Sequence, residues 1–130
     1  MQRPARNLQS DPTEKVDLTN PAAVLEAIDA ILRARYGAGY GRPLLESSIA
    51  DLARAFRGDY PGLLRCDTHY HDLRHALDTG LAMARLIDGH ALANPDTAPK
   101  DIDTEHALIG VLLALYHDIG LLRQIGRAHV

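Results

Sequence analysis

The longest apolar stretch of the chain, residues 107–116, restricts the possible folds more than any other feature. It is shorter than the ~18 apolar residues that a membrane-spanning helix needs. Asp103 or Thr104 can cap a helix that contains this stretch, and Gly120 can end it. Because the stretch is apolar nearly all round, we expect a central, buried helix from Thr104 to about Asp118.

Three more segments have apolar residues at helical spacing. They are residues 19–36, about 44–56 and about 70–88, and they are followed by Gly37, by a turn at 57–62 and by Gly89. Pro21 suits the first turn of the first of these helices, after Thr19 or Asn20 as its cap. No segment shows the pattern of a strand, so the sequence predicts an all-α fold in a single domain.

Composition and charge exclude several classes of protein. The chain has 130 residues, of which 46% are hydrophobic, and this is enough for one globular domain. The net charge of -3 gives no basic surface for nucleic acid, and the N-terminus lacks the apolar segment of a secretory signal. The single cysteine, Cys66, cannot form an internal disulfide, so we expect a cytoplasmic protein with a reduced thiol. Residues 1–18 contain few apolar side chains and are predicted to form a flexible tail.

Two histidine-bearing stretches carry the candidate chemistry. His71 and His75 are i and i+4, so they would share one face of the predicted helix at 70–88. His117 and Asp118 follow the apolar stretch, where a buried carboxylate needs a cation or several hydrogen bonds. Imidazole and carboxylate groups bind divalent ions such as Zn²⁺, Mn²⁺, Mg²⁺ or iron. The two pairs together predict a site for one or two such ions. Three isolated histidines are expected to be ordinary surface or core residues: His69, His90 and His106.

These stretches resemble the motifs of the HD superfamily of metal-dependent phosphohydrolases. Residues 70–76, Tyr-His-Asp-Leu-Arg-His-Ala, are similar to the Tyr-His-Asn-x-x-His-Ala motif of its cyclic nucleotide phosphodiesterase branch, with Asp72 in place of the asparagine. The pair at 117–118 is similar to the His-Asp pair that names the superfamily. That branch often has a further histidine where this chain has Leu121, which indicates a more distant relative. The resemblance covers about residues 60–124.

The resemblance implies a fold and roles for individual residues. Residues 19–124 would form an HD-like helical bundle. His75, His117 and Asp118 match the metal ligands of the superfamily, and His71 matches the catalytic proton donor to the leaving oxygen. The implied reaction is the hydrolysis of a small-molecule phosphate ester, for example a cyclic nucleotide or another nucleotide, by metal-activated water.

The C-terminal part departs from the pattern of the superfamily. That pattern closes with a metal-binding aspartate on a later helix, and no Asp or Glu follows Asp118 here. Residues 125–130 can also be back-translated into the sequence of a common sequencing adapter. We therefore expect a non-native tail after about Gln124, a bundle that is incomplete at its C-terminus, and little activity in a truncated chain. The alternative is a non-catalytic helical interaction or regulatory module on the same scaffold. Apolar surface left uncovered would favour self-association.

Overall fold

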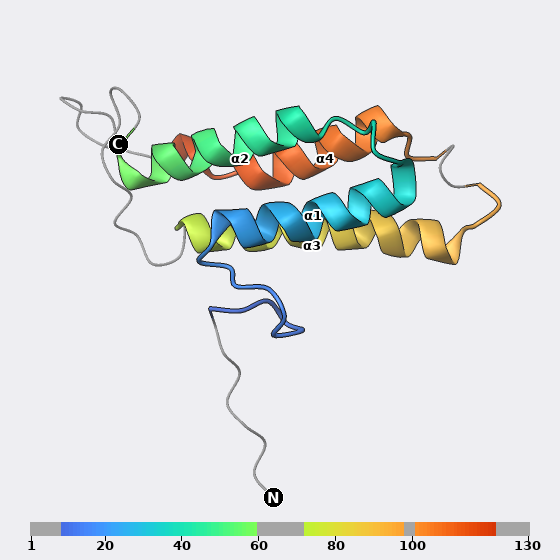
Figure 1. Cartoon of the computed structure of the whole chain (residues 1–130), viewed down its shortest axis with the longest axis horizontal. Helices are drawn as coiled ribbons and strands as arrows, with labels where there is room; N and C mark the ends of the chain where they lie inside the picture. Colours follow the sequence, from blue (N-terminus) through green and yellow to red (C-terminus); the bar gives the residue numbers. More distant parts are fainter. Residues whose placement is uncertain (1–8, 60–71, 98–100, 122–130) are drawn as a thin grey trace, which may run out of the picture.

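The computed structural model describes residues 9–59, 72–97 and 101–121, and this part of the chain is all-helical, as predicted. Four helices follow one another: α1 (Pro21–Tyr36), α2 (Arg42–Arg57), α3 (Leu73–Ala93) and α4 (Thr104–Tyr116), before a short 3-10 helix, η1 (Ile119–Leu121). They form two layers, with α1 and α3 running in one direction and α2 and α4 in the other (Figure 1). Helix α3 contacts α4 and α1, and α2 contacts α1 and α4, so each layer holds two parallel helices and the two layers run antiparallel to each other.

The first two helices begin and end at residues that suit those positions. Asn20 caps α1, and its Oδ1 accepts a hydrogen bond from the backbone N–H of Ala22 at 3.0 Å. Helix α1 ends before Gly37, whose φ of 86° is readily available to glycine. Both ends of α1 confirm the prediction. Helix α2 starts slightly earlier than expected because Pro43 belongs to its first turn, and it ends before Gly58, whose φ is 79°.

A buried polar cluster joins α1 and α2 near their connecting turn. Asp29 is 6% exposed, and its Oδ1 accepts a hydrogen bond from the Tyr40 hydroxyl at 2.6 Å. Its Oδ2 lies 2.8 Å from Nη1 of Arg42, whose Nη2 also pairs with Glu26 at 2.7 Å. Burial alone would raise the pKa of Asp29, but the hydrogen bonds from Tyr40 and Arg33 and the nearby guanidinium charges lower it. The carboxylate therefore stays ionised inside this helical hairpin.

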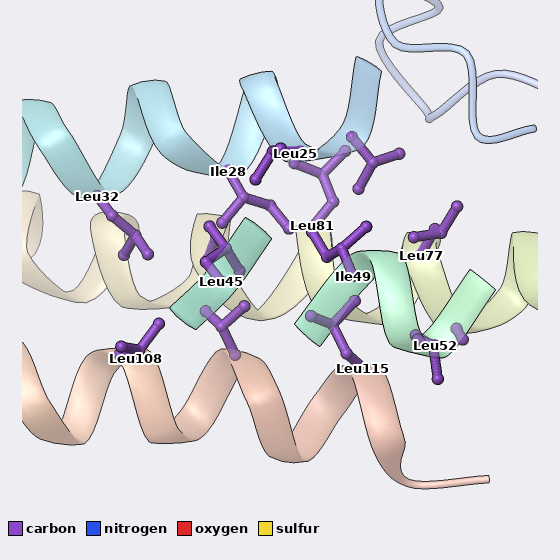
Figure 2. Packing of buried hydrophobic residues seen from close by; sticks show 14 of the residues in the cluster. Leu25, Ile28, Leu32, Leu45, Ile49, Leu52, Leu77, Leu81, Leu108 and Leu115 are labelled. Carbon is purple, nitrogen blue, oxygen red and sulfur yellow. The ribbon is translucent and has the colours of Figure 1, made fainter. Parts of the chain in front are cut away.

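The hydrophobic core lies between the two layers and receives side chains from all four helices. In Figure 2 the labelled leucine and isoleucine side chains of facing helices point into the same interior. Burying each of these side chains stabilises the fold by about 1.5–3 kcal/mol before the cost in entropy. Among the described residues, the largest fully buried hydrophobic side chains are Leu18, Val24, Ile28, Leu32, Leu45, Leu52, Leu77, Leu81, Val111 and Leu115.

Residues 9–18 differ from the flexible tail that we predicted over residues 1–18. Leu18 and Asp11 are both fully buried. The Asp11 carboxylate lies 2.7 Å from Nη2 of Arg85 in α3, and it accepts further hydrogen bonds from its own turn, for example from the N–H of Val16 at 2.9 Å. This polar segment is ordered because its carboxylate has partners, which composition does not reveal. The first eight residues lie outside the described part.

Helix α3 continues past the glycine at which we expected it to end. Gly89 lies inside the helix, which runs on to Ala93. Ile87 and Ala91 are buried on its inner face on either side of the glycine. Their packing outweighs the weak helix propensity of glycine, which amounts to about 1 kcal/mol relative to alanine.

Helix α4 begins as predicted but is less central than expected. Asp103 caps it by accepting a hydrogen bond from the backbone N–H of His106 at 2.9 Å. One face packs against α2 and α3. On the outer face, Ile109 and Leu113 are 46% and 67% exposed, so the described residues leave this apolar face uncovered. None of the described helices is long and apolar enough to cross a membrane.

Candidate metal centre

The start of α3 and the end of α4 bring three of the predicted ligands together. These helices are antiparallel neighbours, so the N-terminal end of one lies beside the C-terminal end of the other (Figure 1). His75 stands in the first turn of α3, and His117 and Asp118 directly follow α4. One ligand atom from each residue lies within 4.8 Å of the other two. The chain therefore places two imidazoles and one carboxylate in a single cluster.

The spacing of these atoms suits a shared cation. Oδ2 of Asp118 lies 3.0 Å from Nε2 of His117 and 3.5 Å from Nε2 of His75. Two ligands that each lie ~2.1 Å from a zinc ion, at an angle of about 90–110°, are roughly 3.0–3.4 Å apart. The two imidazole rings meet edge to face, with centroids 5.2 Å apart and an interplanar angle of 68°. The Asp118–His117 distance falls within this range and the Asp118–His75 distance lies just above it, so a small movement of the His75 side chain would let both rings share an ion with the carboxylate.

A hydrogen bond fixes the orientation of the His117 ring. Its Nδ1 lies 2.7 Å from the carbonyl oxygen of Ala114, and only an N–H can donate to that oxygen. A neutral ring then presents the lone pair of Nε2 to the carboxylate of Asp118. Because two facing lone pairs repel each other, a proton or a cation between them makes this arrangement favourable. Histidines that bind metals commonly donate their other ring N–H to a backbone carbonyl in this way.

The cluster is partly open to solvent. The side chains of His75 and His117 are 29% and 37% exposed, and that of Asp118 is 14% exposed. Catalytic metal sites typically have three protein ligands and an open position for water or substrate. Two neutral imidazoles and one carboxylate carry a charge of about -1, so a divalent ion held here keeps a net positive charge, which attracts anions such as phosphate esters.

Packing between α3 and α4 sets the relative positions of the ligands. Two hydrogen bonds hold the backbone of His75. The Asp72 carboxylate accepts one from the His75 N–H at 2.8 Å, and the Thr79 hydroxyl donates one to the His75 carbonyl oxygen at 2.8 Å. Gly80 packs directly against Leu115, and a Cβ at position 80 would overlap that side chain. The helices can approach this closely only at a glycine. This contact keeps the two ligand-bearing ends near each other.

His71, the predicted proton donor, lies outside the described residues. The helix on which we placed it begins only at Leu73, because Asp72 has the extended backbone and side-chain hydrogen bond of an N-cap. In the described residues the helix thus begins at Leu73, slightly later than the predicted start at about Tyr70.

The face of α3 that carries His75 is partly open to solvent along its length, since Ala82 is exposed and Asp78 is only half-buried. His90 and His106 lie on the surface, as expected, and each pairs with an aspartate. His69 lies outside the described residues.

Sequence reasoning missed an apolar groove between α2 and α4. The groove has a volume of about 300 Å³ and is lined by Ser48, Ile109, Leu112, Leu113 and Tyr116. The Tyr116 hydroxyl donates a hydrogen bond to the Ser48 carbonyl oxygen at 2.6 Å, which ties the two walls together. The sequence suggested uncovered apolar surface but not that Ser48 of α2 borders it. None of the three clustered ligands lines this groove.

Comparisons with family models, with curated proteins and with solved structures found no match to this chain.

Proposed function

We propose that the protein is a metal-dependent phosphohydrolase in which His75, His117 and Asp118 hold a divalent ion. The observation that carries the proposal is the convergence of these three residues, from two helices, at one end of the α3–α4 pair. The resemblance to the HD superfamily independently selects the same three residues as ligands. Geometry and motif therefore support one set.

The residues of the chain have distinct parts in the proposed reaction. When bound, a divalent ion such as Zn²⁺, Mn²⁺, Mg²⁺ or iron supplies Lewis acidity to the phosphate ester and to the attacking water. Asp118 supplies the negative ligand, and the Ala114 carbonyl holds the His117 ring with its Nε2 toward the site. The exposed sides of His75 and His117 leave access for a small-molecule phosphate ester. His71 keeps its sequence-based role as proton donor to the leaving oxygen.

Metal content and hydrolysis together test the proposal. The full chain is purified, its metal content is determined by elemental analysis, and hydrolysis of bis-p-nitrophenyl phosphate is followed with each divalent ion. His75→Ala and Asp118→Ala should each lower the metal content and abolish hydrolysis. His106→Ala is the matched control, because that side chain is 74% exposed and lies at the other end of α4. If neither site variant loses metal, the ligand assignment is wrong. Because we expect only weak hydrolysis from this chain, the assay uses a high protein concentration. If metal binds through these residues but the chain adds no hydrolysis to that of the free ion even then, the hydrolase assignment is wrong.

A separate variant tests the role of His71. His71→Ala should retain metal and lose hydrolysis, because a proton donor acts on the leaving group and not on the ion. A loss of metal in this variant would make His71 a ligand instead.

The apolar groove favours a second candidate function, a non-catalytic helical interaction module on the same scaffold. Its walls include Ile109 and Leu113, which are well exposed, and apolar grooves commonly receive apolar side chains of a partner. The two functions differ in their dependence on metal. A module of this kind would keep its binding activity in Asp118→Ala, whereas a phosphohydrolase would not keep its hydrolysis.

A further inference from the structure

Helix α4 is fastened at each end by a hydrogen bond from a tyrosine hydroxyl to a main-chain carbonyl oxygen. At its start, the Tyr36 hydroxyl at the end of α1 donates to the carbonyl oxygen of Ile102 at 2.8 Å, just before the cap of α4. At its end, the Tyr116 hydroxyl donates to the carbonyl oxygen of Ser48 in α2 at 2.6 Å. Both bonds are partly buried, and they join residues 66 and 68 positions apart. The two tyrosines are therefore alike in their bonding but act at opposite ends of α4.

The end that Tyr116 fastens is the one that carries His117 and Asp118. Successive side chains of an α-helix point about 100° apart, and His117 keeps helical backbone angles, with φ -60° and ψ -28°. The Tyr116 side chain reaches α2, whereas His117 and Asp118 gather with His75 of α3. Because these directions are linked through the backbone, the bond to Ser48 fixes the rotation of the last turn and hence the direction of the His117 ring.

Even a small rotation of this turn would disturb the ligands. A helix with its side chains is about 10–12 Å across, so a rotation of about 10° moves the end of a side chain by about 1 Å. Metal–ligand distances tolerate only about 0.2 Å. The distance of 3.5 Å between Asp118 and His75 spans the two helices, so it changes when α4 rotates. The close contact at Gly80 limits the separation of α3 and α4, and the Tyr116 bond fixes the rotation.

We propose that Tyr116 is a positioning residue whose hydroxyl holds the last turn of α4 at the rotation in which His117 and Asp118 share an ion with His75. In this role Tyr116 touches neither the ion nor the substrate, and it acts through the two residues that follow it. The inference rests on the proposed metal site. It adds to that proposal a part for α2, which supplies none of the three ligands but holds the acceptor of the bond.

A pair of matched tyrosine variants tests the proposal. Tyr116→Phe removes only the hydroxyl, and Tyr36→Phe removes the same kind of bond at the other end of α4. Both should lower the urea midpoint of unfolding by similar amounts. Tyr116→Phe alone should weaken Zn²⁺ binding about tenfold, the lower end of the loss that follows removal of groups that orient metal ligands. It should also change the visible absorption spectrum of the Co²⁺-loaded chain, which reports ligand geometry. Equal Zn²⁺ affinities of the two variants, or a wild-type Co²⁺ spectrum in Tyr116→Phe, would overturn the proposal.

A measurement on the metal-free chain separates this proposal from the proposed function. The rings of His75 and His117 lie edge to face with centroids 5.2 Å apart, so their protons should show a nuclear Overhauser effect. This effect should weaken in Tyr116→Phe and persist in Tyr36→Phe. If the wild type binds no divalent ion, the proposed function is wrong, and the ring contact alone then decides whether Tyr116 positions this end of α4. A contact of equal intensity in both variants would refute the positioning role, even in a chain that binds metal.

Discussion

Gly80 of α3 packs so closely against Leu115 of α4 that a Cβ at position 80 would overlap the leucine side chain. The contact lies at the same end of the helix pair as the ligand cluster, since His75 precedes Gly80 by little more than a turn and His117 follows Leu115. The distance between α3 and α4 at this glycine therefore controls the distance between ligands that come from different helices.

Replacing Gly80 should weaken both the fold and the metal site. We expect Gly80→Ala to cost about 1–3 kcal/mol of stability, because Leu115 must move, even though alanine favours the helix by about 1 kcal/mol. Gly89→Ala is the control in the same helix, since a Cβ there meets nothing within 4 Å. It should stabilise the chain by about 0.5–1 kcal/mol. Urea denaturation and metal titration of the two variants check this, and equal effects would exclude a role for the close contact.

A divalent ion that binds only the folded chain should raise its melting temperature. When the free ion is present at about one hundred times its dissociation constant, the free energy of unfolding increases by about 2.7 kcal/mol. Asp118→Asn should abolish the increase because the site loses its negative ligand. His90→Ala, which removes an exposed histidine outside the cluster, should retain it. Thermal melts with and without a chelator measure the difference. An increase that survives in Asp118→Asn would mean that the metal binds elsewhere.

Asp11 should make stability depend on pH in the acid range. Burial alone would raise the pKa of Asp11, but hydrogen bonds from Thr13, Val16 and Arg85 outweigh it and hold this pKa well below its usual value of 3.8. A lowered folded pKa gives stability that is present above the unfolded value and is lost as the pH falls below 3.8. The Asp11→Asn variant should therefore lose less stability than the wild type as the pH falls below 3.8, so the acid limb of its curve of stability against pH is flatter.

At neutral pH, Asp11→Asn should lower the free energy of unfolding by about 2 kcal/mol, because it weakens a buried charge pair and its hydrogen bonds. Arg85 remains 35% exposed in the side chain, so water can solvate it and the loss stays moderate. Asp96→Asn, at an exposed position, is the control and should leave the acid limb unchanged. Urea denaturation at a series of pH values provides the measurement. Identical acid limbs for Asp11→Asn and the wild type would contradict the argument.

Tyr40 should make stability fall in alkali. Burial and the hydrogen bond to Asp29 raise the pKa of Tyr40 above its usual value of 10.0. A raised folded pKa gives stability that is present below the unfolded value and is lost as the pH rises above 10.0. Tyr40→Phe should lower the free energy of unfolding by about 1 kcal/mol at neutral pH. Above pH 10.0, the stability of this variant should fall less steeply with pH than that of the wild type. An alkaline slope as steep as that of the wild type would contradict this assignment.

Local chemistry made most helix ends predictable from the sequence. The residues at these ends act through hydrogen bonds or backbone angles within a few residues, so the local sequence shows where the helix begins or ends. They are Asn20, Gly37 and Asp103. Gly89 was misread because burial of its neighbours on α3, a tertiary effect, keeps the helix intact. Asp11 was missed because its partner Arg85 is remote in the sequence.

The candidate site was predictable in its members but not in its geometry. The types and order of His75, His117 and Asp118 indicated metal ligands before any fold was known. Their convergence depends on antiparallel packing of α3 and α4 and on the contact at Gly80, which no local pattern encodes. The roles of these residues as ligands, and that of His71 as proton donor, remain predictions for the experiments above.

The position of His117 and Asp118 just after the last residue of α4 affects how an ion would be held. Helix ends fray, since their last carbonyls lack partners within the helix. Fixing two such residues costs about 1–2 kcal/mol of backbone entropy each, which lowers the affinity for an ion relative to ligands inside a rigid helix. Binding should therefore slow amide hydrogen exchange in the last turn of α4 while exchange at Val24 or Leu45, buried in α1 and α2, stays the same. Local order at this one helix end would then report whether an ion is bound.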